Sequence, residues 1–167
     1  MSASPQLHAM TLHPQLLQGG FWLYVWRIEP RYVSEAGHGP YLLYVGRTGD
    51  SSSANAAPPY RRLGQHLGHH PASNALRRHL VARNLVPEKC EHFDFFAYGP
   101  LFPAQLDMKA HLAARDVVAA LECKLAAALQ DGGYDVMNEV RSLKPLDQIL
   151  WQRVREAFRE KFPRICD

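Results

Sequence analysis

The sequence predicts an α+β fold, with a small three-stranded antiparallel sheet flanked by helices in a single domain. Two apolar runs rich in aromatic and β-branched residues follow one another early in the chain, and a third comes after two short helical segments. Two longer helical segments complete the chain, and neither a repeat nor a linker separates a second domain. This order of elements is typical of a sheet with helices packed around it. A chain of 167 residues can bury one hydrophobic core of this kind.

Three strands are predicted, over residues 21–28 (FWLYVWRI), 40–47 (PYLLYVGR) and 91–98 (EHFDFFAY). Glycine and proline residues bound these runs, and Gly99-Pro100 is expected to end the third. The first two runs are separated by a short connection and should pair as antiparallel neighbours.

Two short helices are predicted over residues 60–69 and 73–84, with Ser73 as the N-cap of the second. The loop before them, residues 49–59, is rich in Ser and Ala. Such a composition predicts a flexible loop that buries little surface.

Two longer helices follow, over residues 107–130 and about 146–162. Asp107 can cap the start of the first, and Gly132 ends it. The second is amphipathic. Its apolar side is expected to contain Ile149, Leu150, Val154, Ala157 and Phe158.

The chain divides into an N-terminal extension (1–18), a main domain (19–142) and a C-terminal amphipathic helix (143–167) that packs on the same domain. No apolar run reaches the ~20 residues needed to span a bilayer, and the first residues lack the pattern of a secretory signal. We therefore expect a cytoplasmic protein with no membrane partner. The three cysteines lie far apart in the sequence and are expected to be reduced thiols.

Positive charge is concentrated in one part of the chain. Residues 51–87 contain no Asp or Glu, although the net charge of the whole chain is only +3. The arginines of this stretch are Arg61, Arg62, Arg77, Arg78 and Arg83. A segment of one sign is expected where a protein contacts phosphates, and a solvated basic face is the alternative.

Residues that could take part in catalysis occur in three places. Tyr24 and Tyr44 lie one in each of the first two strands, and Arg62 and His66 are four residues apart on one helical face. Glu122 lies within about 60° of the apolar stripe of the long helix. A carboxylate in that position is costly to bury unless a cation or a metal accompanies it.

A zinc site is a competing interpretation of the histidines. His66, His69, His70 and His79 are close in the sequence, but no Cys or acidic ligand accompanies them. We therefore favour the interpretation that the two tyrosines, Arg62 and Glu122 act together.

Five segments, in order, resemble the motifs of the GIY-YIG endonuclease family. Trp22-Leu23-Tyr24 resembles the GIY element, and Tyr44-Val45-Gly46 resembles the YIG element. Arg62 to His66 is similar to the helix that carries the family's arginine, and Glu122 matches its metal-binding glutamate. Tyr134 to Asn138 is similar to the closing segment that ends in asparagine.

The resemblance implies an endonuclease that hydrolyses phosphodiester bonds in DNA with one divalent metal, Mg²⁺ or Mn²⁺, per site. The catalytic residues that it implies are Tyr24, Tyr44, Arg62, His66, Glu122 and Asn138, with Glu122 as the metal ligand. The positive charges expected to bind the nucleic acid are Arg47, Arg61, Arg77 and Arg78.

The chain departs from the family pattern in two respects. Trp22 and Leu23 replace the glycine and isoleucine of the GIY element, and the stretch from Gly46 to the catalytic arginine is longer than in compact members. The longer stretch leaves Arg61 and Arg62 as candidates for the same role. Arg62 is preferred because His66 lies one turn after it.

Chemistry suggests a role for each of these residues. Arg62 would donate to a nonbridging phosphate oxygen, and Glu122 would hold the metal. Tyr24 is the candidate general base, if Arg62 lowers its pKa, with a relay to Tyr44 or His66; which tyrosine acts stays open. Asn138 would orient other groups by hydrogen bonding.

Two other functions fit the same residues. One is a catalytically silent nucleic-acid-binding module of the same fold, and the other is an RNA-directed nuclease. The sequence contains no zinc finger and no clear helix-turn-helix. Sequence specificity would therefore come from loops, from a homodimer or from a partner protein.

Overall fold

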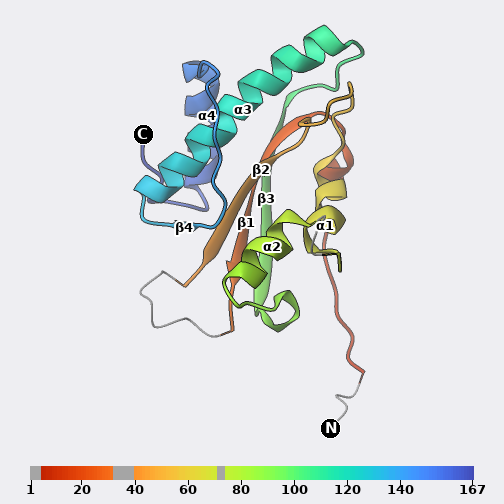
Figure 1. Ribbon diagram of the computed structural model, residues 1–167, viewed down its shortest axis with the longest axis vertical. Coiled ribbons are helices and arrows are strands. Elements are labelled where there is room, and N and C mark those ends of the chain that lie inside the picture. The colour runs from red at the N-terminus through yellow and green to blue at the C-terminus, as the bar shows by residue number, and fades with distance from the viewer. Residues whose placement is uncertain (1–4, 32–39, 71–73) are drawn as a thin grey trace.

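A computed structural model describes residues 5–31, 40–70 and 74–167 of the chain. Within these residues, one sheet has the strand order β3-β1-β2-β4, and helices pack on both of its faces (Figure 1). The strands are β1 (Phe21–Glu29), β2 (Leu42–Arg47), β3 (His92–Phe102) and β4 (Asp135–Val136). The predicted α+β class is confirmed.

The sheet is mixed, so the prediction of three purely antiparallel strands is wrong in one respect. β1 pairs antiparallel with both β2 and β3. The short strand β4 adds to the far side of β2 in the parallel direction, with Leu42 opposite Asp135 and Leu43 opposite Val136. Two residues carry no alternating pattern, so this strand depends on tertiary contacts rather than on local preference.

Strand β3 continues through Gly99-Pro100, which the sequence predicted as its end. β3 lies at the edge of the sheet. A proline has no N–H to donate, and an edge strand tolerates this because its outer side needs no donor for the ladder. The register against β1 shifts between Phe21 and Leu23, close to this proline.

Four α-helices lie within the described residues. They are α1 (Pro59–Leu67), α2 (Ala75–Ala82), α3 (Met108–Asp131) and α4 (Gln148–Arg159). Asp107 caps α3 as predicted, because its side chain accepts a hydrogen bond from the amide of Ala110. Ser73, the predicted N-cap of α2, lies outside the described residues. No helix in the described part of the chain has the length and apolar character needed to cross a membrane.

Both faces of the sheet are covered, which explains why every residue of β1 from Phe21 to Trp26 is apolar or aromatic and buried. Alternate residues of a strand point to opposite faces. Leu23 and Val25 belong to the core formed with α3 and α4, whereas Tyr24 and Trp26 belong to the core formed with α1 and α2. Figure 1 shows the two pairs of helices on opposite sides of the strands.

The buried side of α4 matches the prediction at Val154 and Phe158 and differs from it at Ile149 and Trp151. Trp151, Val154 and Phe158 are buried, and Ile149 is 70% exposed. The buried residues recur at spacings of three and four, and Ile149 lies on the opposite face of the helix. Through its buried side α4 packs against α3 and β3.

The loop between β2 and α1 is anchored more firmly than its composition predicts. Ala56 is buried, and its carbonyl accepts a hydrogen bond of 2.9 Å from the amide of Gly20. The Ser51 hydroxyl donates to the carbonyls of Ser53 and Asn55. The expectation that this loop buries little surface is therefore wrong at Ala56.

Candidate active site

A cavity of about 420 Å³ lies between the sheet, α1 and α3. It collects side chains from segments that are far apart in the sequence. The predicted catalytic residues that line it are Tyr24, Tyr44, Arg62, His66 and Glu122. Its other lining residues are Gly46, Arg47, Asp50, Gln65, Asn74 and Ala75. The structure therefore brings five of the six predicted catalytic residues to one place.

Gly46 makes room for the phenol ring of Tyr24. The two residues are partners in the β1–β2 register. A Cβ atom on Gly46 would lie 2.4 Å from Cζ of Tyr24, far closer than two carbon atoms can approach. The glycine after Tyr44-Val45 is therefore required so that the Tyr24 ring can lie across β2.

Tyr24 is joined to His66. Its hydroxyl lies 2.7 Å from Nε2 of His66, a hydrogen bond between two buried side chains. The ring of Tyr44 packs against the other side chains of this group, with its centroid 5.0 Å from that of His66. Within the described residues, Nδ1 of His66 is buried and has no hydrogen-bond partner. The imidazole is thus enclosed by the two phenols.

Burial sets the protonation states of these three side chains. Desolvation lowers the pKa of His66 from 6.5 to about 4, and the charge of Arg62 acts in the same direction, so the imidazole is neutral at pH 7. Desolvation raises the pKa of Tyr24 well above 10 and that of Tyr44 to about 12. Arg62 lowers the pKa of Tyr24, but less than burial raises it. The expectation that Arg62 would bring this phenol into the neutral range is therefore wrong.

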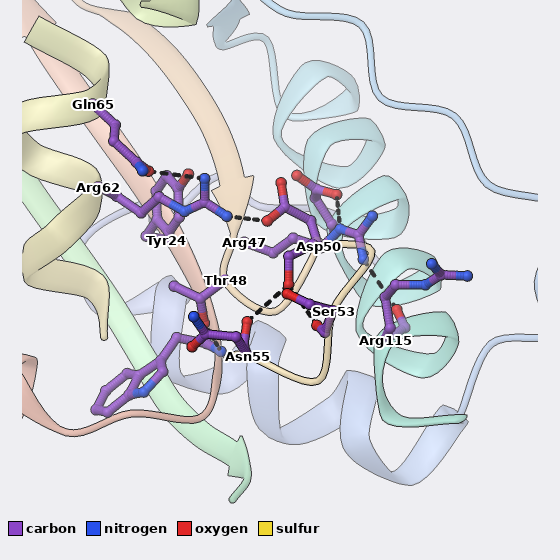
Figure 2. A network of polar contacts seen from close by, with 12 residues as sticks. Tyr24, Arg47, Thr48, Asp50, Ser53, Asn55, Arg62, Gln65 and Arg115 are labelled. Atoms are coloured by element: carbon purple, nitrogen blue, oxygen red, sulfur yellow. Dashed lines mark hydrogen bonds and ion pairs between the residues drawn. The ribbon is translucent and has the colours of Figure 1, made fainter. Parts of the chain in front are cut away.

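Glu122 is paired with Arg47. Nε of Arg47 donates to Oε2 of Glu122 at 2.8 Å, and Nη1 of Arg47 donates to the carbonyl of Arg115 at 3.1 Å (Figure 2). Burial raises the pKa of Glu122 to about 7, although Arg47 opposes this shift. The cation that the sequence led us to expect beside this carboxylate is therefore Arg47, which had been predicted to bind nucleic acid.

Arg62 points into the cavity and is held from two sides. Its Nη2 forms a short ion pair with Oδ1 of Asp50, and its Nη1 donates to Oε1 of Gln65 at 3.1 Å (Figure 2). Arg61 is exposed and lines a different groove, beside Trp26. Of the two adjacent arginines, Arg62 is the one that reaches the cavity.

Asn138 does not line the cavity. Its Oδ1 accepts from the amide of Val45 at 2.9 Å, and its Nδ2 donates to the carbonyl of Val45 at 2.7 Å. Asn138 is buried, and both bonds are made to the residue between Tyr44 and Gly46. Its side chain therefore positions β2, in line with the predicted orienting role.

The arginines predicted to bind nucleic acid differ in their surroundings. Arg47 lines the cavity and Arg61 lines the groove beside Trp26. Arg77 donates to Glu88 at 2.6 Å, and Arg78 is exposed on α2. The structure therefore gives these four residues different surroundings.

Three polar residues of the cavity, Asp50, Gln65 and Asn74, were not singled out from the sequence. Asp50 is the last acidic residue before the stretch 51–87, which contains none. This position next to the basic stretch is the signal that could have identified it.

No known protein family, no curated protein and no solved structure matches the chain. What the site can do therefore has to be argued from its own groups. The cavity is lined by two guanidinium groups, two carboxylates, two protonated phenols and a neutral imidazole. Guanidinium groups suit phosphate, and carboxylates suit a hard divalent cation.

The donor set fits a metal that is bound partly by its substrate. Within residues 5–31, 40–70 and 74–167, no group of three or more His, Cys, Asp or Glu side chains could hold a metal by itself. Glu122 and Asp50 nevertheless face the same cavity. Mg²⁺ commonly binds one or two carboxylates and completes its shell with water and phosphate oxygens.

Proposed function

We propose that this protein is a metal-dependent endonuclease of the GIY-YIG type that hydrolyses phosphodiester bonds in DNA. The observation that carries the proposal is the convergence of Tyr24, Tyr44, Arg62, His66 and Glu122 on one cavity. A structural role alone would not require a buried carboxylate, a guanidinium and a phenol–imidazole pair to share one cavity.

Arg62 supplies the positive charge for the scissile phosphate. Its side chain is 20% exposed and lines the cavity. A guanidinium donates to phosphate in a planar fork, and this bond strengthens as negative charge builds on the nonbridging oxygens.

Tyr24 and His66 together accept the proton of the attacking water. Neither phenol is ionised at neutral pH, so Tyr24 cannot act as a free phenolate. The hydroxyl of Tyr24 can take a proton from water while it passes its own to Nε2 of His66, 2.7 Å away. A neutral imidazole that carries its own proton on Nδ1 can accept that proton at Nε2. This relay favours Tyr24 over Tyr44 as the group that contacts the water.

Glu122 is the proposed ligand of one Mg²⁺ or Mn²⁺, with Asp50 in reach of the same cavity. When bound, such a cation supplies positive charge to the phosphoryl oxygens and to the leaving 3′-oxygen. Arg47 holds Glu122 in place by a hydrogen bond of 2.8 Å from Nε to Oε2. The attack of water on phosphorus breaks the bond to the 3′-oxygen and leaves a 5′-phosphate.

Plasmid cleavage tests the proposal. Wild-type protein should nick or cut supercoiled DNA with Mg²⁺ or Mn²⁺ and stop when EDTA is added, leaving 5′-phosphate ends. Glu122→Gln and Arg62→Ala should fold and lose at least about 100-fold in rate, the usual effect of removing a group that stabilises a transition state.

Each of these variants has a matched control. Arg153→Ala changes an exposed arginine on α4, and Asp131→Asn changes an exposed carboxylate at the end of α3. Both should cut DNA within a few-fold of the wild-type rate. Wild-type protein that binds DNA and RNA but cuts neither would show a silent binding module, and cleavage of RNA alone would show an RNA-directed nuclease.

A further inference from the structure

Asp50 occupies the position on Arg62 that a substrate phosphate would need. Its carboxylate forms a short ion pair with Nη2 of Arg62, while Gln65 accepts from Nη1 of the same guanidinium. The side chain of Asp50 is 44% exposed and that of Arg62 is 20% exposed. Figure 2 shows the carboxylate of Asp50 directed at the guanidinium of Arg62.

The backbone before Asp50 is fixed in place by buried contacts. The Thr48 hydroxyl accepts a hydrogen bond of 2.9 Å from the amide of Trp22 and donates one of 2.6 Å to the carbonyl of Gly20. Gly49 has a φ of +76°, and a Cβ there would lie 2.4 Å from the ring of Phe21. The chain thus enters the loop along a single path that sets Asp50 against α1.

Charge in the cavity is balanced by this arrangement. Arg47 is paired with Glu122, and Arg62 is paired with Asp50. Among the described residues that line the cavity, each guanidinium therefore has a carboxylate beside it. An arriving phosphate meets an arginine whose Nη1 and Nη2 already donate to Gln65 and Asp50.

We propose that Asp50 is an internal phosphate mimic, which holds Arg62 in the substrate-free protein and is displaced when a phosphodiester binds. The proposal rests on the proposed nuclease function. Carboxylate and phosphate both present paired oxygens to the guanidinium fork, so the two anions compete for the same donors. Binding of the nucleic acid then includes the cost of breaking one ion pair.

Displacement of the Asp50 carboxylate should also make DNA binding depend on a divalent cation. Once it leaves Arg62, Asp50 adds a negative charge to the cavity that Glu122 also lines. That charge repels the phosphate unless a divalent cation offsets it. DNA should therefore bind wild-type protein more tightly with Ca²⁺ than with EDTA, and this difference should shrink in Asp50→Asn.

A double-mutant cycle on DNA affinity tests the mimic. Fluorescence anisotropy with a labelled duplex in EDTA is measured for wild type, Asp50→Asn, Arg62→Gln and the double variant. Asp50→Asn should bind about five- to tenfold more tightly than wild type, because the competing anion is gone. In the Arg62→Gln background the same change should alter affinity by less than about twofold. Melting temperatures of all four proteins show that they are folded.

General charge effects are controlled with Asp94→Asn. Asp94 pairs with Arg27 at 2.8 Å, is 40% exposed, and does not line the cavity. Its neutralisation should change DNA affinity by less than about twofold. Asp50→Ser, which also removes the charge, provides a second variant of the loop.

The outcomes separate the mimic from the nuclease function. If Asp50→Asn tightens binding equally with and without Arg62, or does not tighten it, the mimic is wrong. The effects of Asp50→Asn and Arg62→Gln on DNA affinity could be additive while the wild-type protein still cuts the same duplex with Mg²⁺. That result would overturn the mimic and leave the nuclease function standing. Wild-type protein that neither binds nor cuts DNA would overturn both.

Discussion

The carboxylate of Glu122 and the guanidinium of Arg47 form a hydrogen-bonded ion pair of 2.8 Å, with side chains that are 14% and 19% exposed. Arg47 thereby supplies the cation that a carboxylate on the inner side of α3 requires. Loss of one partner is expected to cost more than loss of both, because it leaves a charge with little solvent around it.

Arg47→Met should destabilise the protein by about 2–3 kcal/mol at pH 8, where Glu122 would be left ionised without its partner. The loss should be smaller at pH 5.5, because Glu122 can then take up a proton. The double variant Arg47→Met/Glu122→Gln should recover most of the stability. Urea denaturation of the three proteins and wild type at both pH values measures this, and equal stability of Arg47→Met and wild type at pH 8 would contradict it.

Gly46→Ala should displace the ring of Tyr24, because the new Cβ would lie 2.4 Å from Cζ. Overpacking of this kind costs about 1–3 kcal/mol, and the hydrogen bond from Tyr24 to His66 should be lost with it. Chemical denaturation and near-ultraviolet circular dichroism of the tyrosines measure the two effects. Gly64→Ala is the matched control, since a Cβ on this α1 residue meets nothing within 4 Å. That change should leave the tyrosine signal unchanged and stabilise the helix by about 0.5–1 kcal/mol.

The buried imidazole of His66 predicts a loss of stability in acid. Its pKa is about 4 in the folded protein and 6.5 when unperturbed, so between these pH values the unfolded chain binds a proton that the folded chain does not. The free energy of unfolding should therefore fall as the pH drops from 6.5 to 4, by up to about 3 kcal/mol.

The comparison with His66→Gln isolates this effect. Glu122, with a pKa raised from 4.5 to about 7, acts in the opposite direction, because its contribution to stability falls as the pH rises through that range. Glu122 is present in both proteins, so its effect cancels in the difference between them. The difference in unfolding free energy, measured by urea denaturation from pH 7 to pH 4, should decrease as the pH falls. A difference that does not change with pH would show that folding does not lower the pKa of His66.

The parts of the fold that could be predicted are those with a strong local pattern. The apolar run of β1 and the cap of α3 at Asp107 are each determined by neighbouring residues in the sequence. Both occur where they were expected. β4 has two residues and no pattern, and β3 passes a proline because it lies at the sheet edge. These features depend on which elements become neighbours, and a single local segment does not contain that information.

In the candidate site, too, some features could be predicted from the local sequence and others depend on tertiary contacts. Residue types at the expected spacings sufficed to select Tyr24, Arg62 and Glu122. The partners of the charged groups could not be predicted, since Arg47 and Glu122 are 75 residues apart in the sequence. The direction of the Tyr24 pKa shift also depends on burial, which outweighs the nearby arginine in the folded chain.

Asn138 is expected to act on β2 rather than on the reacting atoms. Asn138→Ala would leave the amide and the carbonyl of Val45 without their partners, at a cost of about 2–4 kcal/mol for two buried backbone groups. Asn138→Asp keeps the acceptor for the amide but places an oxygen against the Val45 carbonyl, and it should be at least as damaging at neutral pH. Asn55→Ala, an exposed asparagine in the β2–α1 loop, should change stability by less than about 0.5 kcal/mol.

Hydrogen exchange distinguishes a positioning role for Asn138 from a catalytic one. In Asn138→Ala the Val45 amide should exchange faster with solvent, because the bond of 2.9 Å that protects it is gone. Any loss of DNA cleavage should then accompany this loosening of β2, since Val45 connects Tyr44 to Gly46. An Asn138→Ala protein with wild-type stability and wild-type exchange at Val45, but with no cleavage, would show instead that the amide contacts the substrate.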